Sequence, residues 1–199
     1  MNNIIEKIIQ ILFRLIGVGW GFGTVSSEVK CVKSIIKNGS VFIDCGGNIG
    51  NYSNEIIKSF DNPEIHIFEP SSKNVNILQK RFKNNNRIKV NGVGLSNKTS
   101  ESILFSNESG SRLGSLTKRK LDHFRINFNI EENIKLIQFE FGGCNIDTRS
   151  FFQDFWYFFN DHNFKIFRIS PLGLIEIKQY KEIYEHITTT NFLCLNKNF

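Results

Sequence analysis

The residues best suited to chemistry in this chain are two carboxylates and a group of glycines beside two short apolar segments. Asp44 ends the first apolar segment and Glu69 ends the second, and a glycine-rich turn with Gly46, Gly47 and Gly50 follows the first. Because the carboxyl ends of parallel strands meet at one edge of a sheet, we expect both acids and the turn to face the same ligand. The pattern predicts a binding site for a nucleoside cofactor.

The spacing of the glycines narrows the choice of cofactor. It matches neither the G-x-G-x-x-G of a dinucleotide site nor the G-x-x-x-x-G-K-[ST] of a P-loop. The order is instead D-x-G-x-N-x-G, formed by Asp44, Gly46, Asn48 and Gly50. Such a loop suits S-adenosylmethionine, which has no phosphate: the bare glycines allow close backbone approach and Asp44 can reach the ammonium group. Glu69 can accept both ribose hydroxyls. The alternative is a structural turn in which Asp44 caps a helix.

Composition and charge set the broad class. The chain has 199 residues, of which 40% are hydrophobic and 22% charged, which is typical of one soluble globular domain. The net charge is +6, and the basic residues are scattered apart from Lys118–Lys120, which could meet an anionic sugar, a phosphate or a membrane, or simply be solvated. The cysteines and histidines lack metal-ligand spacing, so we expect a reduced, cytoplasmic protein without a metal.

The N-terminal segment 4–18 is apolar at helical spacing, with Glu6, Lys7 and Arg14 interrupting it. It is too short and too charged for a membrane span, and it lacks the unbroken core of a signal peptide. An amphipathic helix is expected, packed on the domain or docked on a membrane surface. We expect residues 1–36 to form a helical extension and residues 37–199 the main domain.

Hydrophobic periodicity predicts a β-α-β-α-β succession, which is the signature of a parallel sheet covered by helices. The expected helices are 3–17, 25–36, 49–59 and 71–82, and the expected strands are 40–44, 64–68 and 87–94. Further along, the sequence predicts strands at 101–105, 135–141 and 192–195, helices at 116–125 and 148–160, and a hairpin of 165–169 with 174–177. The aromatic residues of segment 151–159 are expected to be core.

Three segments, Val41–Gly50, Ile65–Pro70 and Asn91–Ser96, follow one another as in FkbM-family methyltransferases, which this chain resembles over roughly residues 35–199. The similarity continues in Gly114–Leu116 and Ile137–Gly143. The family consists of class I S-adenosylmethionine-dependent enzymes, many of which O-methylate sugars in bacterial polysaccharide or natural-product pathways. The resemblance implies an α/β, Rossmann-like sheet, mostly parallel, with an antiparallel C-terminal hairpin.

The resemblance also implies roles for individual residues. The glycine loop would line the methionine end of the cofactor, Glu69 would bind ribose, and Gly94–Ser96 would lie near the adenine. The expected cofactor-binding set is Asp44, Gly46, Gly47, Asn48, Gly50, Tyr52, Glu69 and Ser96. The expected acceptor is a sugar or another small hydroxyl compound. Nucleic acid is not expected, because the [DNS]-P-P-[YF] motif of base N-methylation is absent.

One family motif, K-[IVL]-D-x-E-G-x-E, is missing, so the resemblance predicts the loss of roughly one central strand and one helix. Our hypothesis is that strand 135–141 pairs beside strand 40–44 and brings Glu140 to the place of the missing acids. The candidate general bases are Glu140, His123 and Asp122, in that order. The alternative is a truncated or degenerate relative that binds a partner without doing chemistry.

Overall fold

The chain forms two units with different kinds of sheet. The computed structural model describes residues 2–20, 25–37, 41–95, 134–143, 145, 149–186 and 188–199. Unit 1 consists of Met1–Cys31 with Lys120–Phe199, and unit 2 is Val32–Arg119. Helix α2 (Val25–Ile35) runs across the boundary. The expected division at residues 36 and 37 remains a prediction.

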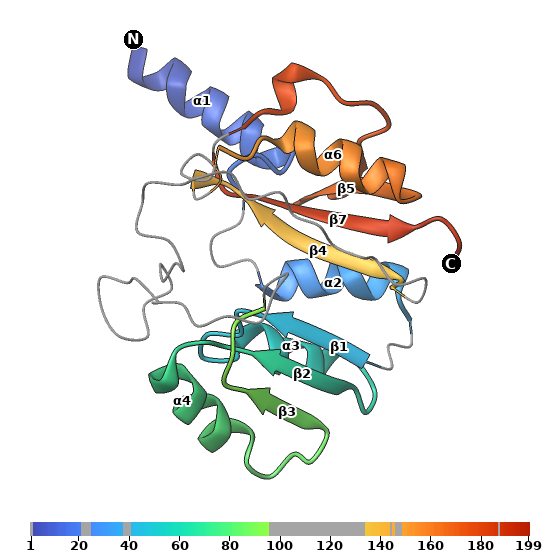
Figure 1. Ribbon diagram of the computed structural model, residues 1–199. Helices are drawn as coiled ribbons and strands as arrows, with labels where there is room; N and C mark the ends of the chain where they lie inside the picture. The colour runs from blue at the N-terminus through green and yellow to red at the C-terminus, as the bar shows by residue number, and fades with distance from the viewer. Residues whose placement is uncertain are drawn as a thin grey trace. The chain divides into compact units, whose positions relative to one another are not determined.

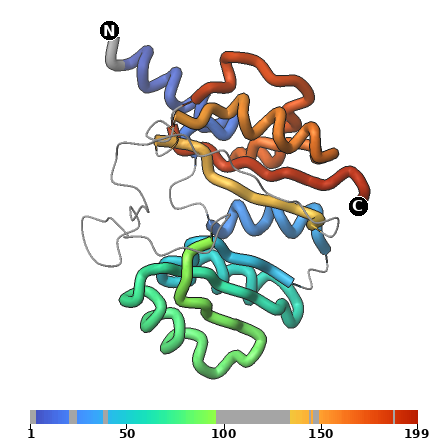
Figure 2. The backbone as a smooth tube through the Cα atoms, viewed as in Figure 1, coloured from blue at the N-terminus to red at the C-terminus, as the bar shows by residue number. Residues whose placement is uncertain are grey.

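Unit 2 contains the predicted β-α-β-α-β succession (Figures 1 and 2). Three parallel strands lie in the order β1-β2-β3, and α3 and α4 connect them; in Figure 2 the trace passes from blue through green along these elements. The bounds are β1 Val41–Cys45, α3 Asn51–Ser59, β2 Glu64–Phe68, α4 Ser72–Phe82 and β3 Ile88–Asn91. The buried apolar side chains are Ile56, Phe60, Ile65, Ile67, Leu78 and Phe82. Asp44 pairs in register with Ile67, so both strands end at the same edge.

Strand β1 differs from the buried strand that the sequence predicted. The side chains of Val41 and Ile43 are 57% and 64% exposed. Among the described residues β1 pairs only with β2, so it is an edge strand and its apolar residues are not covered from both sides. The apolar run is typical of a central parallel strand, and the exposure shows that local sequence alone does not decide which strand becomes an edge.

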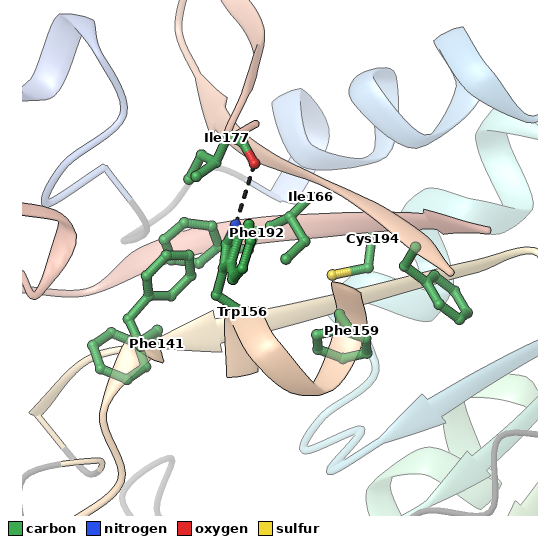
Figure 3. Close-up of a cluster of buried hydrophobic side chains, with 9 residues drawn as sticks. Phe141, Trp156, Phe159, Ile166, Ile177, Phe192 and Cys194 are labelled. Carbon is green, nitrogen blue, oxygen red and sulfur yellow. Dashed lines mark hydrogen bonds between the residues drawn. The ribbon is translucent and has the colours of Figure 1, made fainter. Parts of the chain in front are cut away.

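Unit 1 is built on an antiparallel sheet with the order β4-β7-β5-β6. The bounds are β4 Leu136–Phe141, β5 Phe164–Ser170, β6 Gly173–Glu176 and β7 Thr190–Asn196, and a short 3₁₀ helix, η1, spans Glu182–Tyr184. Helix α6 (Phe152–Asp161) packs its aromatic face against this sheet. Phe152, Trp156 and Phe159 are buried, and Figure 3 shows Trp156 donating its indole N–H to the carbonyl of Ile177 at 3.3 Å. The prediction that this aromatic segment is core is confirmed.

Two N-terminal helices complete unit 1, α1 (Asn2–Leu15) and the first part of α2. Glu28 of α2 is buried, and its carboxylate accepts hydrogen bonds from the amides of Gln138 at 2.8 Å and Asn191 at 3.1 Å. Helix α2 is thereby joined to β4 and β7. None of the described helices is both long enough and apolar enough to cross a bilayer.

The predicted α/β class, with parallel strands and an antiparallel C-terminal hairpin, is confirmed. Among the described residues β4 pairs with β7 in unit 1 and β1 with β2 in unit 2, and the pairing of strand 135–141 beside strand 40–44 stays a prediction. Strand β3 is shorter than predicted, and α6 begins at Phe152, after the predicted start. The predicted strand 101–105 and helix 116–125 lie outside the described residues.

Candidate functional site

Glu69 occupies the end of β2, where the sequence predicted a ribose ligand. Its side chain is only 6% exposed, and one carboxylate oxygen accepts the backbone N–H of Asn48 at 2.8 Å. The other oxygen accepts the backbone N–H of Ser71, also at 2.8 Å. Each carboxylate oxygen has a second lone pair, so two acceptor positions remain for hydroxyl groups. Glu69 therefore fixes the glycine loop and the start of α4, and it keeps the capacity expected of a ribose ligand.

Asp44 lies near the end of β1, and a side chain of α3 donates a hydrogen bond to it. Its Oδ2 accepts the hydroxyl of Ser53 at 2.5 Å, and Ser53 is fully buried. Burial raises the pKa of the Asp44 carboxyl; hydrogen bonds from Ser53 act in the opposite direction, and the charge of Glu69 adds to the increase. The partial burial and the nearby second carboxylate make this position favourable for a cation, such as an ammonium group.

The turn between β1 and α3 contains three glycines, and a side chain at each position would meet different surroundings. Gly46 has a φ of +80°, and a Cβ there would meet nothing within 4 Å, so open space lies over its backbone. A Cβ on Gly47 would lie 2.2 Å from Cγ2 of Ile67, so this position is fixed by packing on β2. Gly50 has a φ of +83°, and a Cβ there would lie 2.7 Å from the ring of Phe82. Only Gly46 offers space to a ligand.

Backbone hydrogen bonds close this turn on the neighbouring strand. The N–H groups of Gly46 and Gly47 both point to the carbonyl of Phe68, at 2.8 and 3.2 Å. The N–H of Glu69 donates to the carbonyl of Asn91 at 3.0 Å, which joins the end of β2 to that of β3. Asn48, with a φ of +49°, presents its N–H to Glu69. The ends of the three strands and the loop thus form one connected edge.

The structure brings together six members of the predicted cofactor set: Asp44, Gly46, Gly47, Asn48, Gly50 and Glu69. Tyr52 is half-buried in the first turn of α3, on the helix that follows the loop. Cys45, the last residue of β1, is exposed. Ser96, His123 and Asp122 lie outside the described residues.

Glu140 belongs to β4 in unit 1, and its register partner is Asn191. Desolvation and, second, the negative charge of Glu28 raise the pKa of the Glu140 carboxyl. Its role as a general base stays a prediction, as does that of His123. The buried Glu28 beside it had no signal in the sequence, because an acid in an amphipathic helix normally marks a solvent-facing position.

Within the described residues, no group of three or more His, Cys, Asp or Glu side chains is arranged to hold a metal ion. A surface hollow of about 140 Å³ in unit 1 is lined by Trp156, Asn160, Lys165, Lys178 and neighbouring residues. It contains none of the predicted site residues. Six of the predicted site residues lie instead at the strand edge of unit 2.

The raised pKa of Asp44 gives a testable dependence of stability on pH. A carboxyl with a higher pKa in the folded state contributes stability below its unfolded value near 3.8, and that contribution is lost as the pH rises through the folded value. Asp44→Asn cannot ionise and can still accept the Ser53 hydroxyl, so its melting temperature at pH 7 should equal or exceed that of the parent. Thermal melts from pH 3.5 to 7 should show this advantage growing with pH; a variant less stable at pH 7 than at pH 4, relative to the parent, would contradict it.

Comparison with protein-family models and with curated proteins gave no match for this sequence. Among solved structures, the chain resembles the plantazolicin methyltransferase BpumL, determined with a triazolic desmethylPZN analog and SAH, at 11% identity over 87% of this chain and 84% of that chain, with a TM-score of 0.48. It also resembles a proposed rRNA methylase from Clostridium thermocellum at 10% identity, over 86% of this chain and 96% of that chain, with a TM-score of 0.47.

A further match is to a proposed S-adenosyl-L-methionine-dependent methyltransferase from Methanococcus maripaludis, at 18% identity and a TM-score of 0.32. It covers 46% of this chain and only 40% of that one. At these identities and TM-scores the matches describe a partial resemblance of fold and carry no argument about activity.

Proposed function

We propose that this chain is an S-adenosylmethionine-dependent methyltransferase that O-methylates a sugar or another small hydroxyl compound. The observation that supports the proposal best is the orientation of the Glu69 carboxylate. Two backbone N–H groups orient its carboxylate at the carboxyl end of a parallel strand, beside a loop whose Gly46 faces open space. A preoriented acid acceptor next to bare backbone is what a ribose with two hydroxyls requires.

The residues at the strand edge fit the proposed cofactor. Glu69 would accept the ribose hydroxyls, Asp44 would bind the ammonium group, and the backbone at Gly46 would pass close to the ligand. The cofactor supplies an activated methyl group on a sulfonium. The protein's part is to hold the acceptor hydroxyl in line and to exclude water, with Glu140 and His123 as the proposed bases.

A non-catalytic binding module is the second candidate. It is favoured by the exposed edge of β1, at the position where the acidic strand of the resembled family is missing. The two candidates differ in one property that can be measured directly, since a methyltransferase must bind the cofactor and its product, whereas a scaffold need not.

Isothermal titration with S-adenosylhomocysteine tests the proposal on the intact chain. We expect micromolar binding, and we expect Gly46→Val to weaken it at least about tenfold, because the new side chain enters the open space over the loop. Gly173→Val is the matched control: Gly173 also has a positive φ, of +110°, and also faces open space, but it lies in unit 1.

The control separates strain from ligand exclusion, because both variants place valine at a left-handed position. Loss of binding in Gly46→Val alone supports the site. If the folded parent chain does not bind the ligand, the methyltransferase proposal fails and the binding module is favoured. If Gly46→Val binds as tightly as the parent, any cofactor site lies elsewhere.

A further inference from the structure

Helix α1 presents a broad apolar surface that the rest of unit 1 does not cover. Nine large apolar residues of the segment from residue 4 to residue 16 are between 39% and 66% exposed: Ile4, Ile5, Ile8, Ile9, Ile11, Leu12, Phe13, Leu15 and Ile16. Monomeric soluble proteins rarely expose contiguous apolar surface of this kind without using it for binding. We name these nine residues the α1 apolar face.

Among the described residues, the contacts that attach α1 to the rest of unit 1 lie near the C-terminal end of the helix. The ring of Phe13 lies 5.8 Å from that of His186, and Val18, just after the helix, is buried. Gly17 approaches the carbonyl of Ile169 so closely that a Cβ would lie 2.3 Å from the oxygen. The N–H of Gly19 donates to the hydroxyl of Thr190 at 3.3 Å. These contacts fix the end of α1 and leave the preceding turns exposed.

The distribution of residues around the helix indicates what covers this face. Successive residues are rotated by about 100°, so the apolar face spans an arc of about 200°. Pairing with a second copy of the helix in a coiled coil needs a narrow seam of two positions in seven, which buries much less of such an arc. A broad apolar arc opposite a narrow charged one is instead typical of helices that lie in a membrane interface.

The charges on the remaining arc agree with an anionic lipid surface. Lys7 and Arg14 lie two turns apart on the same side of the helix, next to the edge of the apolar face, and Glu6 is the one acid of the helix. The whole chain carries a net charge of +6 at pH 7. Long basic side chains at this boundary can place their stems along the acyl chains and their charges among the headgroups.

We propose that α1 docks this protein on an anionic membrane surface, with the α1 apolar face toward the acyl chains and Lys7 and Arg14 among the headgroups. The helix lies in the interface and does not cross the bilayer, because it is too short to span the hydrocarbon core. This inference is independent of the proposed methyl transfer, and it concerns unit 1 alone.

Sedimentation with sucrose-loaded vesicles tests the proposal on the intact chain. The vesicles are pure phosphatidylcholine or phosphatidylcholine with about one quarter phosphatidylglycerol. We expect binding to the anionic vesicles, weaker binding to the neutral ones, and weaker binding at high salt. Leu12→Glu, at the centre of the apolar arc, should lower the partition coefficient at least about tenfold, since a buried leucine side chain contributes this much or more.

Gln10→Glu is the matched control, because it adds the same charge on the polar side of the same helix. Its partition coefficient should change by no more than about fivefold, since one charge near an anionic surface contributes about 1 kcal/mol. Residues 10 and 12 are both exposed, so both variants should keep the melting temperature of the parent. Similar binding of both variants would overturn the proposal, and so would a parent chain that binds neither vesicle. Light scattering that shows a lipid-free dimer, dissociated by Leu12→Glu, without vesicle binding would assign the face to a second copy instead.

Discussion

Replacing Glu69 by alanine should lower the free energy of unfolding by about 2–4 kcal/mol and weaken the binding of S-adenosylhomocysteine by about 1–3 kcal/mol. The substitution removes the acceptor of two backbone N–H groups, those of Asn48 and Ser71. An unsatisfied, partly buried donor costs about 1–3 kcal/mol. The loss of the proposed ribose acceptor adds a separate loss of affinity. Urea unfolding and isothermal titration, the latter well below the melting temperature, measure the two effects.

Glu64→Ala is the control on the same strand. Glu64 lies at the start of β2, at the opposite end from Glu69, and its carboxylate meets Lys89 at 2.9 Å and His66 at 3.1 Å on the surface. Its removal should leave the affinity for the ligand unchanged. A Glu69→Ala chain that is destabilised but still binds with parental affinity would make Glu69 a purely structural residue. A chain with unchanged stability would show that the two hydrogen bonds contribute nothing measurable.

Gly50→Ala should destabilise the protein by about 2–4 kcal/mol, although alanine is a better helix former than glycine. The residue has a φ of +83°, and the new Cβ would lie 2.7 Å from Phe82 and 2.8 Å from Leu78. Both neighbours are buried, so they cannot move away without disturbing the packing of α4. The left-handed backbone adds about 1–2 kcal/mol to the cost.

The variant Gly46→Ala separates the cost of the left-handed backbone from the cost of the steric clash. Gly46 has nearly the same φ, +80°, but no atom lies within 4 Å of its Cβ position. It should therefore lose only the conformational part, about 1–2 kcal/mol. Chemical denaturation of both variants measures the difference, which is the cost of overpacking between the loop and α4. Equal losses in the two variants would mean that Phe82 and Leu78 rearrange freely around the new methyl group.

Local sequence was sufficient to predict the elements of the site, because each has a local cause. The apolar runs before Asp44 and Glu69 predicted β1 and β2, and parallel pairing then placed both acids at one edge. Helical spacing predicted α3 and α4 within two residues of their observed bounds. The inner side of the aromatic helix α6 was also predictable, since its apolar residues recur at helical spacing.

Features that depend on distant residues could not be predicted. The run 136–141 places Ile137, Phe139 and Phe141 on one face of the strand, but this alternation does not select which strand becomes its neighbour. In the structure this run, β4, pairs with β7, and Phe139 stacks on Phe192 with ring centroids 5.4 Å apart. The packing role of Gly47 was missed for a similar reason, because its contact is with Ile67 on the next strand. Likewise, Glu28 finds its hydrogen-bond partners only in β4 and β7.

The order of the two units along the chain has a consequence for the kinetics of folding. Unit 2 is continuous, whereas unit 1 joins Met1–Cys31 to Lys120–Phe199. Bringing these two segments together closes a loop over all of unit 2, which for a flexible chain costs on the order of 4 kcal/mol in entropy. If unit 2 folds first it shortens that loop, so refolding should show a fast phase from β1, β2 and β3. A slower phase should follow, in which Glu28 meets Gln138 and Asn191 and α2 becomes fixed to the antiparallel sheet.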